Sequence, residues 1–162
     1  MVEEHAGASR FGAARRDRRR AAVVTAASVV VQRRIEWPDT DASGHYHYST
    51  AFRLAEAAEA VLHDRLGIIR ETFGRTPRVR VSADFRSVLR FHDVVDVELR
   101  VAAVGRTSVT YAFAVRRDDV VAVEGEVATV LLERPEGATA PVPDVWRRLL
   151  LEAGPQRPET FA

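Results

Sequence analysis

Apolar and polar residues alternate along most of the second half of the chain, with the period of two that is typical of strands with one buried face. Four such stretches follow residue 77, and short turns at 105–107 and 117–119 separate the later ones. One more stretch begins at Ser28 and ends at Pro38, which cannot donate a ladder hydrogen bond. Short connections predict an antiparallel meander. The positions predicted to face inward are Val29, Val31, Ile35, Trp37, Val79, Val81, Ala83, Phe85, Leu89, Val95, Val97, Leu99, Val101, Val109, Tyr111, Phe113 and Val115.

A long helix is predicted between the first strand and the other four, from Thr50 to Leu66. Its composition is rich in Ala and Leu, Ser49 or Thr50 can cap its start, and Gly67 suits its end. Apolar residues cover so much of its surface that we expect a sheet to wrap it. The order of strand, helix and four strands predicts an α+β fold, with one antiparallel sheet around a central helix. A short C-terminal helix is expected from Asp144.

The length of 162 residues favours a single domain. Residues 1–26 show no apolar period and are rich in arginine, which predicts a flexible N-terminal tail. We expect the folded domain to span 27–153 and a loose C-terminal tail to span 154–162.

Composition excludes several kinds of chemistry. The chain has no cysteine, which removes disulfides, thiolate nucleophiles and Cys-ligated metals, and all 24 of its basic residues are arginine, which removes Schiff-base lysines. Residues 1–22 hold six arginines and three acids, which leaves 18 arginines and 20 acids for the remainder. That balance argues against nucleic acid as a partner. No apolar run approaches the roughly 20 residues of a membrane helix, and we expect a cytoplasmic protein.

The candidate chemistry gathers in residues 37–48, between the first strand and the helix. This stretch holds two carboxylates, a glycine, two histidines and two tyrosines. Asp41 is suited to act as a nucleophile or general base, and the amides of residues 47–49, at the helix entrance, are suited to stabilise a developing oxyanion. The residues alone leave a second interpretation open, in which Asp41 only stabilises the turn through its side chain.

The element order, together with the Asp-Thr-Asp-Ala-Ser-Gly-His sequence at 39–45, resembles the hotdog-fold acyl-CoA thioesterases, and most closely the 4-hydroxybenzoyl-CoA thioesterase group. The resemblance covers about residues 28–150 and includes Phe91-His92-Asp93 and Glu56. It implies that Asp41 is the catalytic carboxylate and that the Tyr48 amide polarises the thioester carbonyl. It also implies a homodimer or homotetramer with active sites between subunits, and CoA phosphates near Arg106.

Other residues of the stretch are assigned by their position. His45 is a further catalytic candidate, and its Gly-His pair is similar to that of the long-chain acyl thioesterase branch; His47, Ser49 and Glu56 are substrate-binding candidates. The alternatives are hydrogen-bonded turn histidines and a structural Glu56, and Ser49 and Thr50 stand where many relatives have asparagine. We expect no metal, because no distant ligand accompanies the turn, and no cofactor beyond the CoA or phosphopantetheine of the substrate.

The sequence therefore predicts an acyl-CoA or acyl-carrier-protein thioesterase. A second hypothesis is a hydratase or dehydratase of the same fold, although Tyr46 stands where the Asp-x4-His pattern of such enzymes has histidine. A third is a non-catalytic protein that binds acyl thioesters.

Overall fold

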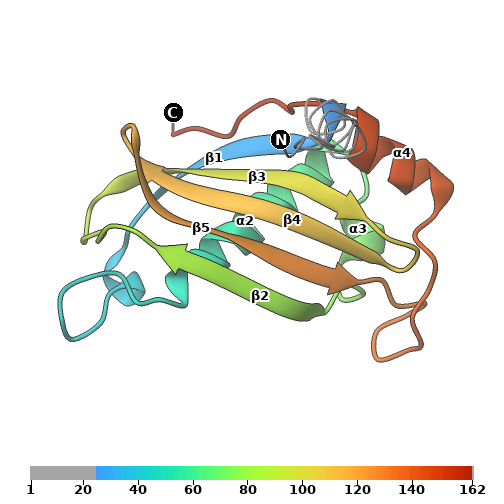
Figure 1. Cartoon of the computed structure of the whole chain (residues 1–162), viewed down its shortest axis with the longest axis horizontal. Helices are drawn as coiled ribbons and strands as arrows, with labels where there is room; N and C mark the ends of the chain where they lie inside the picture. The colour runs from blue at the N-terminus through green and yellow to red at the C-terminus, as the bar shows by residue number, and fades with distance from the viewer. Residues whose placement is uncertain (1–24, 162) are drawn as a thin grey trace, which may run out of the picture.

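The computed structural model describes residues 25–161, so that the predicted N-terminal tail lies almost wholly outside the described residues. A five-stranded antiparallel sheet dominates the molecule (Figure 1). Its strands lie in the order β1-β3-β4-β5-β2, which makes β1 and β2 the two edges. The strands are β1 (Ser28–Arg34), β2 (Arg78–Phe85), β3 (Val94–Val104), β4 (Ser108–Arg117) and β5 (Val120–Val130).

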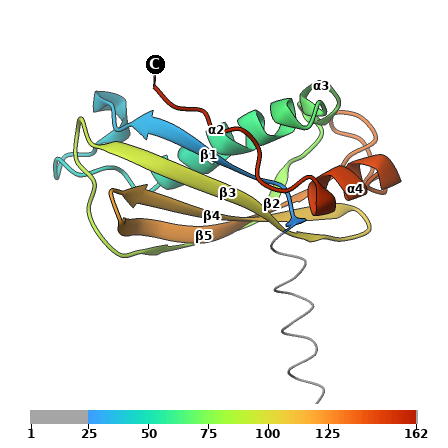
Figure 2. The ribbon, with the colours of Figure 1, turned by 90° about the horizontal axis from the view of Figure 1, so that it is seen from above.

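The helix α2 (Thr50–Arg65) lies against one face of this sheet, as Figure 2 shows from above. It begins at the predicted residue and ends one residue early, before Gly67 adopts a φ of +72°. Its buried face is built largely of alanines, Ala51, Ala55 and Ala58, which lets the helix approach the sheet closely. The α+β class and the hotdog arrangement predicted from the sequence are confirmed.

The central strands carry the core. Inward residues of β3 and β4 alternate as predicted and are almost fully buried, Tyr111 included. Burial at about 25 cal/mol per Å² of apolar surface makes this helix–sheet contact the main source of stability. The alternation of apolar and polar residues in the sequence is therefore enough to predict which side chains of β3 and β4 are buried.

The edge strand β2 differs from the prediction. Its inward positions were expected in the core, yet Val79 is 59% exposed, Val81 47% and Phe85 49%. The reason is the strand order, because β2 is hydrogen-bonded only to β5 and α2 packs chiefly against β1 and β3. An apolar strand at an open edge invites pairing with another chain.

The first strand also ends earlier than predicted. After Arg34 the chain leaves the sheet, and Trp37 enters a short 3-10 turn, η1 (Trp37–Asp39), in which Pro38 takes part. Trp37 was predicted to face inward with Ile35, but its side chain is 74% exposed. The alternation of the strand therefore continues in the sequence beyond the point where the strand itself stops.

The C-terminal segment is ordered against β1 instead of loose. After α4 (Asp144–Glu152), the predicted short helix, residues 155–161 run beside β1 in the parallel direction. The Glu159 amide donates to the Val30 carbonyl at 3.0 Å, and the Gln32 amide donates to the Glu159 carbonyl at 2.7 Å. We call residues 155–161 the C-terminal strap. Its backbone groups occupy the β1 edge, which a loose tail would leave open.

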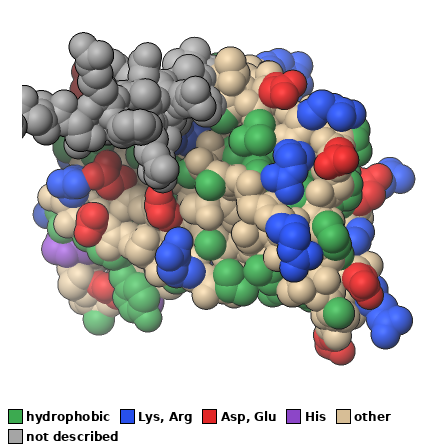
Figure 3. Space-filling model, turned by 45° about the vertical axis from the view of Figure 1, so that its right-hand side comes forward, with side chains coloured by type: hydrophobic (Ala, Val, Ile, Leu, Met, Phe, Trp, Pro, Cys, Tyr) green, Lys and Arg blue, Asp and Glu red, His purple; other side chains and the backbone are tan. Residues whose placement is uncertain are grey.

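Charged side chains of both signs are spread over the surface. On the face seen in Figure 3, arginines and acids are interspersed among apolar and neutral groups, without a continuous basic patch on the part left uncovered by grey atoms. This agrees with the slight acid excess of the chain beyond its first 22 residues. Within residues 25–161, no helix is long and apolar enough to cross a bilayer.

Candidate active site

Residues 39–48 form a closed loop, here the Asp41 loop, at the end of the sheet where β1 stops (left in Figure 1). The Asp41 amide donates to the His45 carbonyl at 2.9 Å, and Gly44 supplies the left-handed φ of +76° that the turn needs. The Tyr46 amide donates to the Leu89 carbonyl at 2.9 Å, which fixes the loop to the β2–β3 connection. Backbone bonds at both ends therefore hold the loop in place.

Asp41 uses one carboxylate oxygen for the loop and leaves the other free. Its Oδ1 accepts from the Ser43 hydroxyl at 2.5 Å and from the Ser43 amide at 2.8 Å, whereas Oδ2 has no hydrogen bond within residues 25–161. The side-chain and then the backbone bond from Ser43 lower the pKa of Asp41, which is therefore ionised at neutral pH. The turn-stabilising role and a chemical role are thus compatible, because each uses a different oxygen.

One amide at the helix entrance is free. The sequence predicted free amides at 47–49, but the His47 amide donates to the Asp39 carbonyl at 2.7 Å and the Ser49 amide to the His47 ring at 3.3 Å. The Tyr48 amide makes no hydrogen bond to any residue of the described chain. The amide that the family resemblance selected is therefore the one available to a ligand.

The side chains expected to cap the helix have other partners. The Ser49 hydroxyl lies 2.7 Å from His47 Nδ1, and the Thr50 hydroxyl donates to the Asp39 carbonyl at 3.0 Å. Because the Ser49 amide also points at Nδ1, that nitrogen acts as an acceptor and the proton of neutral His47 lies on Nε2. His47 and Ser49 thus form one unit, stacked against Tyr48 at 4.4 Å between ring centroids.

Asp39 and His45, the other carboxylate and histidine of the loop, differ in whether their side chains are hydrogen-bonded within the described chain. Asp39 is structural, because its carboxylate accepts from the Glu36 amide and from Arg53, each at 2.8 Å. His45 is half-buried, and its backbone pairs with Arg90, but its ring makes no hydrogen bond within the described residues. The ring of His45 is therefore available to a ligand, whereas both carboxylate oxygens of Asp39 are already hydrogen-bonded.

The hydroxyl of Tyr46 is buried without a hydrogen-bond partner among the described residues. An unpaired buried hydroxyl costs about 1–3 kcal/mol. We therefore expect Tyr46→Phe to raise the free energy of unfolding by about 1 kcal/mol in urea titrations of the apoprotein. A matched change, Tyr111→Phe, removes a hydroxyl that lies 2.8 Å from His63 Nε2 and should be destabilising. A loss of stability in Tyr46→Phe would mean that its hydroxyl has a partner.

Glu56 lies outside the Asp41 loop. It is exposed, and its carboxylate lies 3.3 Å from the Nε of Arg78, the first residue of β2. Arg78 also contacts Glu59 at 2.6 Å, so that one guanidinium joins two turns of α2 to the edge strand. These residues line a cavity of about 280 Å³ between α2, the short helix α3 (Ile69–Thr72) and the start of β2.

Two buried ionisable residues beside this cavity were missed in the sequence. Glu59 and His63 are 5% and 3% exposed. His63 lies between the hydroxyls of Tyr111, at 2.8 Å, and Thr72, at 3.0 Å. Glu56, Glu59 and His63 repeat at intervals of three and four on a helix whose middle is otherwise apolar, and this spacing is the signal that could have revealed them.

Burial moves the pKa values of these two residues in opposite directions. It raises the pKa of Glu59 to about 7, against the opposing charge of Arg78 and with a smaller push from Glu56, and it lowers the pKa of His63 to about 4, with Arg78 adding to the effect. Glu59 therefore stabilises the fold less as pH rises from about 4.5 to 7, because the folded state holds the extra proton. His63 stabilises it less as pH falls from about 6.5 to 4.

These two contributions nearly cancel between pH 4.5 and 6.5. Removing Glu59 as a titrating group with Glu59→Gln should expose the His63 contribution. We expect the free energy of unfolding of that variant to increase by about 1 kcal/mol per pH unit across this interval, while that of the wild type changes far less. Chemical denaturation at pH 4.5, 5.5 and 6.5 measures both slopes. Equal slopes in the two proteins would show that Glu59 is not protonated on folding.

Arg106 lies far from the loop in the same protomer. It follows β3, which starts beside the loop and extends over 11 residues, roughly 35 Å at 3.3 Å per residue. Its carbonyl accepts from Val142, at the opposite end of the sheet. Arg106 is therefore separated from this loop by about the length of β3 within one protomer.

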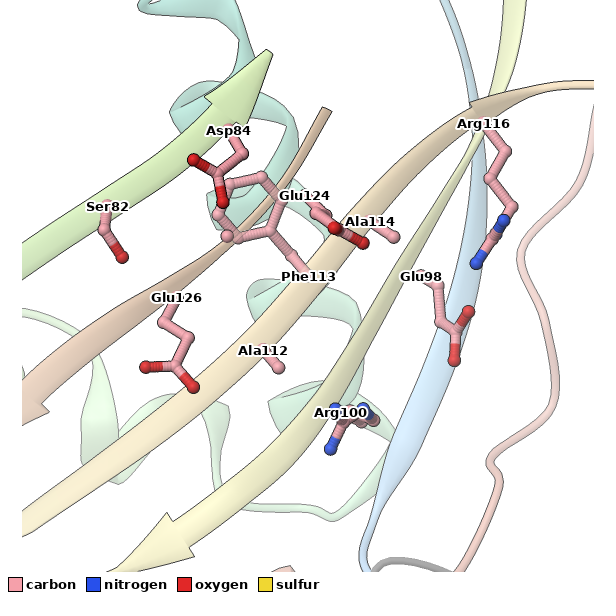
Figure 4. Close-up of a pocket in the computed structure, with 11 residues that line it drawn as sticks. Ser82, Asp84, Glu98, Arg100, Ala112, Phe113, Ala114, Arg116, Glu124 and Glu126 are labelled. Carbon is pink, nitrogen blue, oxygen red and sulfur yellow. The ribbon is translucent and has the colours of Figure 1, made fainter. Parts of the chain in front are cut away.

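A hollow of about 450 Å³ lies on the outer face of the sheet (Figure 4). Its floor is formed by Ala112 and Ala114 of β4, and charged residues from the neighbouring strands surround it. It lies on the side of the sheet opposite α2 and is lined by no residue of the Asp41 loop. The same described residues contain no group of three or more histidines and acids placed to hold a metal ion.

The family model described as "Thioesterase superfamily" matches residues 43–124, half of the chain. The chain belongs to this superfamily. The match begins two residues after Asp41 and includes Tyr48, α2 and most of the meander. Among curated proteins no match is found.

Solved structures share the fold of this chain. A hypothetical protein from Thermus thermophilus is 28% identical, with a TM-score of 0.67 over 75% of this chain and 95% of its own. A thioesterase from the same species, complexed with coenzyme A and zinc, is 24% identical, with a TM-score of 0.68 over 75% of this chain and 90% of its own. The 1,4-dihydroxy-2-naphthoyl-CoA thioesterase from Synechocystis is 20% identical, with a TM-score of 0.64 over 76% and 95%.

Proposed function

We propose that this superfamily member hydrolyses acyl-CoA thioesters to a free acid and a thiol. The observation that carries the proposal is the pairing of a free carboxylate oxygen, Oδ2 of Asp41, with a free amide, that of Tyr48, in one rigid loop. Thioester hydrolysis needs an attacking oxygen and a donor for the carbonyl oxygen. The names of two compared structures, with CoA bound in one and a CoA thioester as substrate in the other, support CoA as the thiol.

In the proposed mechanism the thioester carbonyl oxygen accepts from the Tyr48 amide. Negative charge develops on this oxygen as the carbonyl carbon becomes tetrahedral, and a preoriented donor is worth about 3–4 kcal/mol at that stage. Asp41 either attacks the carbon itself or takes a proton from an attacking water, and its lowered pKa keeps it ionised for either role. Ser43 holds the carboxylate in position, and His45 lines the approach.

The site is incomplete in one protomer, because Asp41 is exposed and a carboxylate in bulk water is a weak catalyst. We propose that a second copy pairs through the β2 edge and covers it. Antiparallel pairing of two β2 strands places the start of one strand beside the end of the other. Phe85 at that end contacts Tyr46, at 6.2 Å between ring centroids, so the partner's α2–α3 cavity approaches this loop.

In this arrangement the acyl group extends from Asp41 toward the partner's cavity. Glu56, with Arg78, would then contact the substrate of the other protomer, and His47 and Ser49 would line the start of the same channel. Arg106, at the far end of each sheet, would likewise approach only the neighbouring site. A homodimer is the smallest assembly that satisfies these roles.

The experiment is free-thiol release from short, medium, long and aromatic acyl-CoAs. We expect turnover of at least one class. If no acyl-CoA is hydrolysed, acyl-carrier-protein substrates are tested next, and failure of both refutes the proposal. Binding without turnover that is unchanged in Asp41→Ala would favour the non-catalytic binder, and water addition to an enoyl thioester without thiol release would favour the hydratase.

A further inference from the structure

Three aromatic side chains lie together on the surface next to the Asp41 loop. Trp37 is 74% exposed and meets the ring of Phe91 edge-on, at 5.9 Å between centroids. Phe91 is 41% exposed and lies against His92, at 3.8 Å between ring centroids and with the ring planes tilted by 36°. We call Trp37, Phe91 and His92 the aromatic platform. Exposed apolar groups gathered in this way indicate a binding surface, since large apolar side chains are otherwise favoured in the core.

The backbone holds this platform in place at some cost. His92 has a φ of +72°, in the left-handed region that residues other than glycine seldom adopt. Its amide donates to the Ile35 carbonyl at 2.9 Å, and the neighbouring Ile35 amide donates to the Asp93 carbonyl at 2.8 Å. Glycine would form this turn without strain, but it would remove the imidazole from Phe91. Strain of this kind gathers at functional sites.

The platform and the Asp41 loop form one rigid unit. The Trp37 carbonyl accepts from the amide and the hydroxyl of Thr40, at 3.1 and 2.8 Å. On the other side of the loop, the backbone of Arg90 pairs with that of His45. Asp41 follows Trp37 by four positions in the chain, so their Cα atoms lie at most about 14 Å apart. That distance is comparable with the reach of a pantetheine arm.

The charges around the platform suit a phosphorylated aromatic ligand. Arg90 is exposed, and its side chain makes no ion pair among residues 25–161. The nearby carboxylate of Asp93 is balanced by Arg117 at 2.8 Å, and that of Glu36 accepts from the Asp39 amide within η1. A cluster of exposed aromatic rings beside a free cation matches a heteroaromatic base that is joined to phosphates, because the base can lie on the face of one ring while its phosphates contact the cation.

We propose that the aromatic platform binds the adenine base of CoA and that Arg90 contacts its phosphates. This inference rests on the proposed thioesterase function and deepens it by selecting the form of the thiol. The phosphopantetheine arm of a carrier protein has no base to stack on the platform. The platform therefore makes the site specific for CoA thioesters over carrier-protein thioesters.

The test compares one acyl group on CoA and on pantetheine, which lacks the nucleotide. In Trp37→Ala we expect the KM for acyl-CoA to rise about tenfold, while kcat and the kinetics with acyl-pantetheine change less than twofold. Trp37→Phe should retain most of the affinity, and Arg90→Gln should raise the KM for acyl-CoA alone. The control is Val145→Ala, an exposed apolar change on α4, which should alter neither substrate.

A second readout does not depend on activity. Trp37 and Trp146 are the two tryptophans of the chain, so in Trp146→Phe the fluorescence reports Trp37 alone. We expect adenosine 3′,5′-bisphosphate to quench it saturably. Quenching without any thioester hydrolysis would support nucleotide binding by the platform and refute the proposed function. Two results with Trp37→Ala would overturn the platform proposal. Equal losses of activity on acyl-CoA and acyl-pantetheine would assign Trp37 to the chemistry, and dissociation of the oligomer would assign it to a subunit contact.

Discussion

Asp41→Asn should lower kcat/KM for acyl-CoA hydrolysis by about 10³-fold or more, and KM should change little. The amide keeps the shape of the side chain and can still accept from Ser43 through one oxygen, so that the loop retains its conformation. It can neither attack the carbonyl nor accept a proton from water. A thousandfold loss corresponds to about 4 kcal/mol of transition-state stabilisation, which is within the range for a catalytic base or nucleophile. Thiol release under saturating and subsaturating substrate measures both constants.

The matched control is Asp64→Asn, the same chemical change at an exposed position near the end of α2. It should leave kcat/KM within twofold of the wild type. An Asp41→Asn protein that keeps its activity would move the catalytic role to His45 and retain the thioesterase assignment. Comparing the two variants separates the loss of this carboxylate from a general effect of charge.

If two copies pair through the β2 edge as proposed, Val81→Asp should convert this dimer to monomers and abolish most of the activity. Val81 lies in the middle of β2, and its side chain is 47% exposed on an edge that has no neighbour in one protomer. If two copies meet there, a carboxylate at that position is buried against its own symmetry mate, and like charges that face each other across strands are destabilising. We expect the dimer dissociation constant to increase at least about 100-fold, or about 3 kcal/mol.

Sedimentation velocity at several protein concentrations, with thiol release on the same samples, gives both quantities. Val120→Asp provides the control, because Val120 is 55% exposed at the β4–β5 turn and lies outside the part of β5 that pairs with β2. A Val81→Asp protein that remains dimeric and active would place the interface elsewhere. A monomer with full activity would instead show that one protomer suffices for catalysis.

Features of the fold that depend on neighbouring residues in the chain were predicted from the sequence, and features that depend on distant residues were not. The bounds of α2 follow from an alanine-rich composition and from Gly67, so they were predicted to within one residue. The exposure of the apolar side chains of β2 was not predicted, because alternation shows only that a strand has an apolar face. Whether that face meets the helix of its own chain or a second chain is decided by strand order.

The same distinction applies to the site. The motif at 39–45 selected Asp41 as the candidate carboxylate, a role that stays a prediction. The family resemblance selected the Tyr48 amide, which the folded loop leaves without a partner among the described residues. The number of free amides was overestimated, because the carbonyl of Asp39 and the ring of His47 come into reach only once the loop has folded back. Arg106 was suggested as a contact for the CoA phosphates by the family resemblance alone. The sequence pattern did not show that the whole length of β3 separates it from the loop of its own protomer.

The C-terminal strap also determines how far assembly can proceed. Because the strap bonds to outer backbone groups of Ser28, Val30 and Gln32, β2 is the one sheet edge that no other segment of residues 25–161 covers. If two copies pair through β2 as proposed, they form one continuous sheet of ten strands, which cannot be extended through a further uncovered edge of the described chain. Removing the strap would give each protomer two such edges, one at either side of the sheet. The protein would then acquire the geometry of a fibre, in which every added copy offers a site for the next.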